Sequence, residues 1–145
     1  MSEKILIEDL INYAKKFIGR PYKYGAKQYE IPKVFDCSAF IQYIYKKIGV
    51  KLPRTALRQA HFGKTISINE LRPGDLIFAK GITGRYNVEF PKGVGHVAMF
   101  IGDNKVIQAK YRKNEDGSNG GMVEISDVKK LLSKKDLTII KRIIK

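Results

Sequence analysis

The segment FDCSAFIQYIYKKIGV, residues 35–50, combines a strong helical pattern with the single cysteine of the chain. Its large apolar residues recur at helical spacing and fall on one face: Phe40, Ile41, Ile44, Tyr45 and Ile48. Gly49 follows this run, and glycine commonly ends a helix because it tolerates a left-handed backbone. The segment therefore predicts a helix over residues 37–48 that begins at Cys37.

A cysteine at the start of a helix is a candidate nucleophile. The free backbone N–H groups and the helix dipole favour the thiolate there. The polar neighbours Asp36 and Ser38 support this interpretation. The alternative is a buried core residue between Phe35 and Phe40, which is the more common role of an isolated cysteine. A single cysteine in any case excludes an internal disulfide and a cysteine-rich zinc site.

A catalytic thiol needs a base within hydrogen-bonding reach, and the chain offers two histidines. His96 begins the run HVAMFIG, which is typical of a buried strand, and the preceding GVG leaves room to present the ring. His61 lies at the end of a short polar helix, where a surface histidine is usual. We therefore predict His96 as the base.

The base works best when a third group accepts its other ring N–H. The turn GDNK, residues 102–105, predicts a hairpin whose antiparallel strands would bring Gln108 beside His96. Alternation with Ile107 and Ala109 would also make Gln108 an ordinary outward-facing strand residue. Spacing alone leaves both interpretations open.

Outward from this centre, the pattern predicts helices over about 6–18, 54–62 and 126–135. The polar stretch 113–121 predicts a flexible loop. The second half of the chain contains short runs typical of strands: residues 75–80, 96–102, 105–111, 121–125 and 137–143. These elements predict an α+β fold in which an N-terminal helical part precedes an antiparallel sheet, and a length of 145 residues predicts one domain over 1–145.

The charge balance is strongly basic, with 28 Lys and Arg against 14 Asp and Glu. A net charge of +14 attracts polyanions over long range, so nucleic acid, anionic lipid and anionic cell-wall polymers are candidate partners. The N-terminal residues 1–16 lack the pattern of a secretory signal, and no stretch approaches the ~20 apolar residues of a membrane span. Localisation therefore stays open.

The order and spacing of several motifs resemble the NlpC family of papain-like cell-wall cysteine peptidases. The resemblance covers roughly residues 7–110 and is carried by the motifs PYKYGA, FDCSAFIQYIYKKIGVKLPRTA, LRPGDLIFA and GHVAMFIGDNKVIQA. The resemblance implies a papain-like NlpC fold, with the nucleophile helix packed on a central antiparallel sheet. It assigns Cys37 as nucleophile, His96 as base and Gln108 as the orienting residue.

By the same resemblance, the Tyr22 hydroxyl helps to hold the oxyanion together with the Cys37 backbone N–H. Asp36 and Ser38 match positions that line the substrate cleft and can receive a free amino group. Arg54 and Thr55 match a family motif to which we assign a structural role first. Many relatives have histidine in place of Gln108. The segment 81–95, which is long and rich in basic and aromatic residues, is expected to form a lip over the cleft.

The resemblance implies hydrolysis of peptidoglycan stem peptides at the bacterial cell wall, commonly between γ-D-glutamate and diaminopimelate or lysine. Cys37 would form a thioester with His96 as general base and acid, without a metal or organic cofactor. One alternative is an amidase or acyltransferase that acts on an amide or ester outside the wall. Another is a non-catalytic basic module that binds wall polymer or nucleic acid, although no specific nucleic-acid motif is present. A phage lysin, a remodelling enzyme and a toxin remain open, and a toxin would require an inhibitor or immunity protein as partner.

Overall fold

The computed structural model describes residues 2–144 and contains an N-terminal helical part followed by a sheet. In chain order its elements are α1 (Glu3–Lys15), η1 (Gln28–Glu30), α2 (Cys37–Lys47), α3 (Ala56–Gln59), β1 (Lys64–Thr65), η2 (Ile68–Glu70), β2 (Leu76–Ala79), β3 (His96–Gly102), β4 (Lys105–Lys113), β5 (Asn119–Asp127) and β6 (Leu137–Arg142). The expected α+β fold is therefore confirmed.

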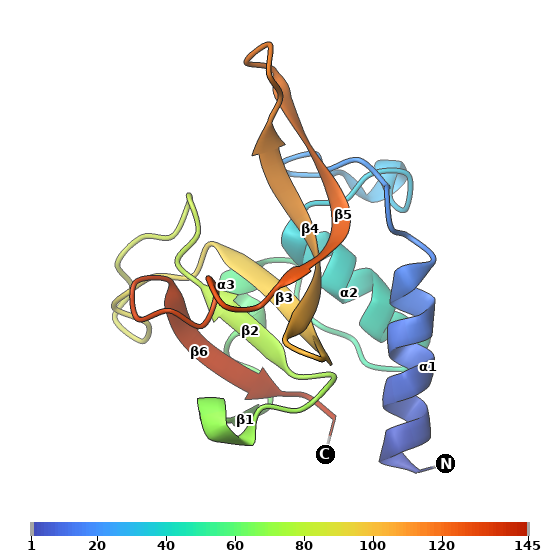
Figure 1. The fold of residues 1–145 in the computed structure, drawn as a ribbon, viewed down its shortest axis with the longest axis vertical. Helices are drawn as coiled ribbons and strands as arrows, with labels where there is room; N and C mark the ends of the chain where they lie inside the picture. The colour runs from blue at the N-terminus through green and yellow to red at the C-terminus, as the bar shows by residue number, and fades with distance from the viewer. Residues whose placement is uncertain (1, 145) are drawn as a thin grey trace.

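The strands form an antiparallel sheet with the order β1-β6-β2-β3-β4-β5. The last two strands of this order extend beyond the others as a long hairpin, which projects at the top of Figure 1. Helices α1 and α2 lie beside each other on one side of the sheet, where α2 packs against β3 and β4 (Figure 1). The helix that begins at Cys37 is thus held against the strand that begins at His96.

Alternating strand residues supply two hydrophobic cores, one on each face of the sheet. Val97 and Met99 of β3 join the larger core, which contains the buried faces of α1 and α2. Ala98 and Phe100 join a smaller core, which is covered by the segment after β5 through Val128 and Leu131. By the same alternation, His96 and Gln108 lie on the face of the smaller core.

The first helix begins and ends about three residues earlier than the predicted range 6–18. The Ser2 hydroxyl accepts a hydrogen bond from the Ile5 N–H at 3.3 Å and so caps α1 at its start. Gly19, with φ +94°, ends the last turn. The helix predicted over 54–62 is shorter than expected: α3 spans Ala56–Gln59, and turns follow it.

The predicted hairpin between β3 and β4 is confirmed. Asp103 and Asn104 both have positive φ, 51° and 59°, as a two-residue type I′ connection requires. The prediction of a flexible polar loop over 113–121 was wrong at both ends. Lys113 still pairs with Asn119 in the β4–β5 ladder, so the connection between the strands is limited to residues 114–118.

The helix predicted over 126–135 was also wrong. Its first residues, Ser126 and Asp127, continue strand β5, and the rest forms successive turns before β6. The Val128 N–H donates to the Asn104 carbonyl of the β3–β4 turn at 2.9 Å, which directs Val128 into the smaller core. A contact with a distant turn therefore overrides the local helical pattern of this segment.

Across residues 2–144, none of the helices has the length and apolar character needed to cross a membrane.

Candidate active site

Cys37 is the first residue of α2, and its side chain is 7% exposed. The Asp36 carboxylate caps this helix by accepting the Ala39 N–H at 2.8 Å. The backbone N–H groups of Val97 and Ser38 are directed at the Cys37 sulfur. Val97 follows His96 directly, so the thiol lies against the start of β3.

The position of Val97 explains how the thiol reaches the sheet. The β3–β4 pairing runs from Gly102 and Lys105 to Met99 and Ile107, and Val97 lies beyond its end. Its N–H is therefore available to the Cys37 sulfur. The N-terminus of α2 thus meets the sheet where β3 and β4 cease to pair.

The His96 ring is held by Gln108 from the neighbouring strand, with 2.6 Å between His96 Nε2 and Gln108 Oε1. Gln108 is 3% exposed. Because an amide oxygen only accepts, Nε2 carries the proton, and Nδ1 of the neutral ring is left as the basic nitrogen. The predicted contact between His96 and Gln108 is therefore present. When the register of the Met99–Ile107 pair is continued along the strands, Gln108 does not lie directly opposite His96. It is a diagonal neighbour of His96 on the same face of the sheet.

The second histidine lies in a different environment. His61 pairs with Glu89 at 3.0 Å between Nδ1 and Oε2, and its ring contacts Phe90 edge to face at a centroid distance of 5.0 Å. Phe90 belongs to the segment 81–95. His61 thus anchors this segment to the end of α3, whereas the thiol lies at the start of β3.

Tyr22 is placed beside the start of helix α2 by backbone hydrogen bonds on both sides. Its N–H donates to the Gly121 carbonyl of β5 at 3.0 Å, and the adjacent Lys23 N–H donates to the Phe35 carbonyl at 3.0 Å. Burial, followed by the neighbouring Cys37 and Asp36, raises the pKa of the Tyr22 hydroxyl. The hydroxyl is therefore a neutral donor within electrostatic range of the thiol.

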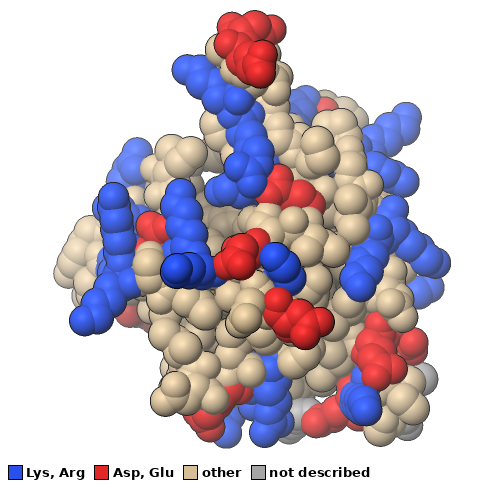
Figure 2. All heavy atoms as spheres, viewed as in Figure 1, with Lys and Arg blue, Asp and Glu red and all other residues tan. Residues whose placement is uncertain are grey.

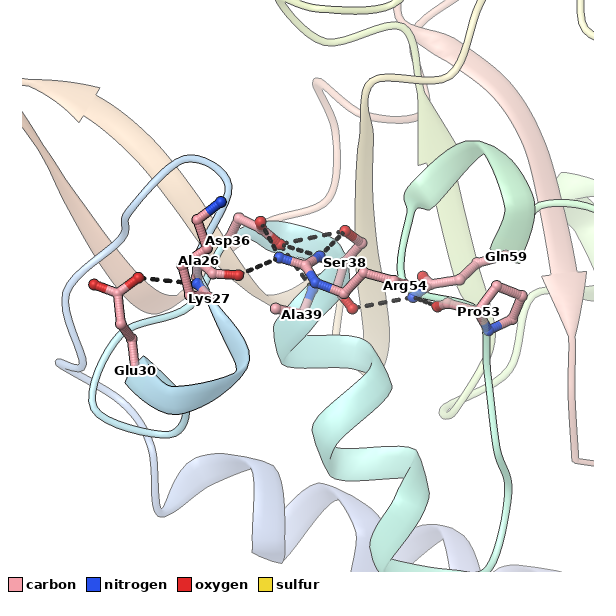
Figure 3. A network of polar contacts seen from close by, with 9 residues as sticks. All are labelled: Ala26, Lys27, Glu30, Asp36, Ser38, Ala39, Pro53, Arg54 and Gln59. Atoms are coloured by element: carbon pink, nitrogen blue, oxygen red, sulfur yellow. Dashed lines mark hydrogen bonds and ion pairs between the residues drawn. The ribbon is translucent and has the colours of Figure 1, made fainter.

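Asp36, Ser38 and Arg54 form a polar network at the same helix end (Figure 3). The Arg54 guanidinium donates to Asp36 Oδ2 at 2.5 Å, to Asp36 Oδ1 at 3.0 Å and to the Ser38 hydroxyl at 3.0 Å. It also donates to the Ala26 carbonyl at 2.9 Å. Arg54 thereby connects the loop before α2 to the helix end, which agrees with a structural role for this motif.

Gln59 extends this network on the side of α3. Its amide nitrogen donates to the Ser38 carbonyl at 3.0 Å and to the Pro53 carbonyl at 2.8 Å (Figure 3). Nothing in the sequence pattern points to Gln59. Its position four residues after the capping Thr55 gives no signal of contact with helix α2, because the contact depends on tertiary packing.

The ionisation of the resting pair differs from the sequence expectation. Burial raises the pKa of the Cys37 thiol to about 11, and the Asp36 carboxylate adds to the effect. The N–H groups of Val97 and Ser38 and the Arg54 charge lower this pKa by less. Burial lowers the pKa of His96 to about 4, and the hydrogen bond that His96 donates to Gln108 only partly opposes this effect. At neutral pH both groups are therefore uncharged, although Cys37 lies at a helix N-terminus as predicted.

The segment 81–95 packs against the body of the protein at several points. Phe90 and Val94 are buried, and the Thr138 hydroxyl donates to the Gly93 carbonyl at 2.6 Å. Lys92 donates to the Leu137 carbonyl at 2.9 Å. The exposed apolar side chains of the segment 81–95 are Ile82, Tyr86 and Val88. The expectation of a lip over the cleft remains a prediction.

Within residues 2–144, no group of three or more His, Cys, Asp or Glu side chains is arranged to hold a metal ion.

Comparison with known proteins gives the family. The model of the NlpC/P60 family matches residues 19–142, and the chain belongs to this family. Its α+β architecture is the papain-like fold of these domains. The predicted family and fold are therefore confirmed.

Individual relatives agree with this assignment. A γ-D-glutamyl-L-lysine dipeptidyl-peptidase of Bacillus cereus is 38% identical over 103 residues, which are 70% of this chain and 28% of that protein. An NlpC/P60 family protein of Bacillus cereus matches with a TM-score of 0.74 and 30% identity, over 96% of this chain and 40% of the other. RipD of Mycobacterium tuberculosis, described as a non-catalytic NlpC/p60 domain protein adapted to peptidoglycan binding, shares the fold with a TM-score of 0.69 and 22% identity, over 94% of this chain and 96% of the other.

The chain spans less than a third of the length of several curated relatives that it matches, between 19% and 32%.

Proposed function

We propose that residues 1–145 form one catalytic domain, a cysteine peptidase that hydrolyses the bond between γ-D-glutamate and a diamino acid in peptidoglycan stem peptides. The observation that carries this proposal is the position of the Cys37 sulfur against the Val97 N–H, directly beside His96, whose ring is held by Gln108. The name of the Bacillus cereus relative, a γ-D-glutamyl-L-lysine dipeptidyl-peptidase, supports the choice of bond.

The proposed reaction begins from the neutral pair. His96 Nδ1 takes the thiol proton as the Cys37 sulfur bonds to the amide carbon, and the carbonyl oxygen becomes an oxyanion. The C–N bond then breaks, and the leaving amine takes the proton from Nδ1. Water next gives a proton to Nδ1 and attacks the thioester, and the sulfur leaves as a thiol after regaining that proton.

Tyr22 is the proposed side-chain donor to the oxyanion. Its hydroxyl is neutral and within electrostatic range of Cys37, and the N–H groups at the start of α2 face the same region. A preorganised donor of this kind typically stabilises the transition state by about 2.7–4 kcal/mol.

Asp36 and Ser38 are the proposed contacts for a free amino group of the substrate. Asp36 Oδ1 already accepts from Ala39, Ser38 and Arg54, whereas Oδ2 accepts from Arg54. A carboxylate oxygen offers two lone pairs, so Oδ2 retains one for an ammonium group. A dipeptidyl-peptidase needs such a contact, because it measures its cut from a free amino end.

The proposal predicts that purified protein releases defined peptides from peptidoglycan and that Cys37→Ala abolishes the release. Mass spectrometry of the soluble products from walls of different stem composition locates the cut bond. His96→Ala should also be inactive, whereas the matched control His61→Ala should keep its activity, because His61 pairs with Glu89 and has no part in the proposed reaction.

Two results would contradict the proposal. Hydrolysis by Cys37→Ala at the rate of the unchanged protein would exclude the thiol mechanism. Binding to wall material without any cleavage, equal in the protein and in Cys37→Ala, would instead favour a non-catalytic wall-binding module.

A further inference from the structure

A half-buried lysine lies next to the pair formed by His96 and Gln108. Lys110 follows Gln108 by two residues on β4, so both side chains lie on the same face of the sheet. Its backbone pairs with Met122 of β5. Farther along the strand, Arg112 and Lys113 are exposed, whereas Lys110 is partly enclosed. The Lys110 charge is close enough to His96 to lower the pKa of the imidazole.

Lys110 makes no ion pair with any residue of the described range 2–144. Glu124 is the carboxylate opposite Gln108 in the β4–β5 ladder, but it is bound by Arg112 through hydrogen bonds of 2.8 and 2.5 Å and also accepts from Ser126. The nearest carboxylate on the strand pair is thus already neutralised by another cation.

The wider surroundings of Lys110 are mixed in charge. Burial, Lys130 and Arg112 lower the pKa of Lys110, whereas Glu124 and Asp136 raise it by less. Figure 2 shows a hollow at the base of the projecting hairpin with basic side chains on its border. A partly buried cation without a partner is costly, and an anionic ligand would relieve this cost.

The reaction indicates which part of the substrate would supply that anion. His96 must protonate the leaving amine, so the residue that carries this amine lies on the His96 side of the scissile bond. This is the face of the sheet that also carries Lys110. The polar network of Asp36, Ser38 and Arg54 lies instead at the start of α2.

We propose that Lys110 is a specificity-determining residue that binds a free carboxylate on the leaving-group residue of the stem peptide. Diaminopimelate carries a second carboxylate at the far end of its side chain, and lysine does not. The protein should therefore prefer a stem with diaminopimelate over one with lysine or with amidated diaminopimelate. This inference rests on the proposed peptidase function.

The test compares two stem peptides that differ only in the far group of diaminopimelate, carboxylate in one and carboxamide in the other. Release of the products is followed by chromatography and mass spectrometry. The unchanged protein should show a kcat/KM about tenfold or more higher for the carboxylate, which is the range expected for a hydrogen bond to a charged group. Lys110→Met should bring the ratio of the two values close to one.

Two further variants make the result specific. Lys110→Arg keeps a cation at this position and should keep the preference. Lys113→Met makes the same change at an exposed position of the same strand and should behave as the unchanged protein. Any effect of Lys110 on the His96 imidazole acts on both substrates alike, so the ratio reports carboxylate recognition.

The possible failures are distinguishable. Equal cleavage of both stems by the unchanged protein, or an unchanged ratio in a folded Lys110→Met, would overturn the assignment of Lys110 and leave the peptidase function standing. Cleavage of neither stem would overturn the proposed function and the Lys110 inference with it. Should Lys110→Met not fold, Lys110→Gln, which also removes the charge, takes its place in the comparison.

Discussion

At the Cys37 sulfur, burial and a neighbouring carboxylate raise the pKa of the thiol, whereas the N–H groups at the start of helix α2 lower it. Burial has the larger effect, and the pKa of the thiol is raised to about 11. A helix N-terminus stabilises negative charge only to a limited extent, and here it acts on a side chain that is 7% exposed. The resting thiol is therefore protonated, and in the proposed reaction its proton moves to His96 as the sulfur attacks the substrate.

This balance predicts how the free protein reacts with iodoacetamide. Only the thiolate reacts, so the rate of alkylation should rise about tenfold per pH unit between pH 7 and 10 without levelling off. In the chain unfolded by urea, the rate should level near the ordinary thiol pKa of about 8.5. A native rate that is already constant around pH 7 would contradict the raised pKa. Mass spectrometry of the alkylated protein follows both reactions.

In the proposed reaction, Gln108 acts through His96 as a positioning residue. Its oxygen accepts the Nε2 proton at 2.6 Å and so leaves Nδ1 free as the base. Loss of this hydrogen bond in Gln108→Ala should lower kcat by about ten- to hundredfold. Gln108→His should keep most of the activity, because a neutral imidazole also offers a nitrogen that can accept the Nε2 proton.

The pH profile separates this role from a merely structural one. His96 has its pKa lowered to about 4, so kcat/KM should fall on the acid side near that pH as the imidazole becomes protonated. In Gln108→Glu a carboxylate would stabilise the imidazolium and raise this pKa. The acid limb should therefore move to higher pH. A limb that stays in place in a folded Gln108→Glu would contradict the role given to Gln108.

At the scale of elements, the sequence predicts well what local chemistry decides. The turn of the β3–β4 hairpin has two residues with positive φ, Asp103 and Asn104, and both residue types tolerate this conformation. The start of α2 is likewise decided by neighbouring residues, because the Asp36 cap and the apolar face are both visible in the sequence. The hairpin carries His96 and Gln108 and the helix carries Cys37, which explains why all three could be singled out from the sequence.

Features that depend on distant contacts could not be predicted. The segment after β5 has a helical pattern, but Val128 is bound to Asn104 and packs in the smaller core. Arg54 reaches Asp36 across 18 positions, and no spacing rule predicts that contact. Among the described residues 2–144 Lys110 has no ion pair, and Glu124 is bound by Arg112 instead, which only the folded strand pair reveals.

Across the whole molecule, charge is arranged differently on the surface and in the core: the surface is basic, whereas a carboxylate inside the fold lies against a cation. Lys and Arg side chains are spread over the face shown in Figure 2, in keeping with a net charge of +14. Such charge favours attraction to anionic polymers but repels itself in the compact state. Asp75 is 1% exposed and is one of the carboxylates placed inside the fold against a cation.

The ion pair of Asp75 and Arg142 joins the start of β2 to the end of β6. Arg142 donates to both Asp75 oxygens at 2.8 and 2.9 Å and to the Glu70 carbonyl at 2.7 Å. The Arg72 N–H donates to the same carboxylate at 2.8 Å. This arrangement satisfies the buried charge and fastens the last strand of the chain to the centre of the sheet.

Asp75→Ala should lower the free energy of unfolding by about 3–5 kcal/mol, because it leaves the largely buried guanidinium of Arg142 without a counter-charge. Urea unfolding followed by circular dichroism measures the change. The control is Asp127→Ala, whose ion pair with Lys105 spans 3.9 Å between exposed side chains and should contribute less than about 1 kcal/mol. The double variant Asp75→Leu with Arg142→Met should be more stable than Asp75→Ala, since it removes both charges. A cost for Asp75→Ala no greater than that for Asp127→Ala would show that the last strand is held by its apolar contacts and ladder alone.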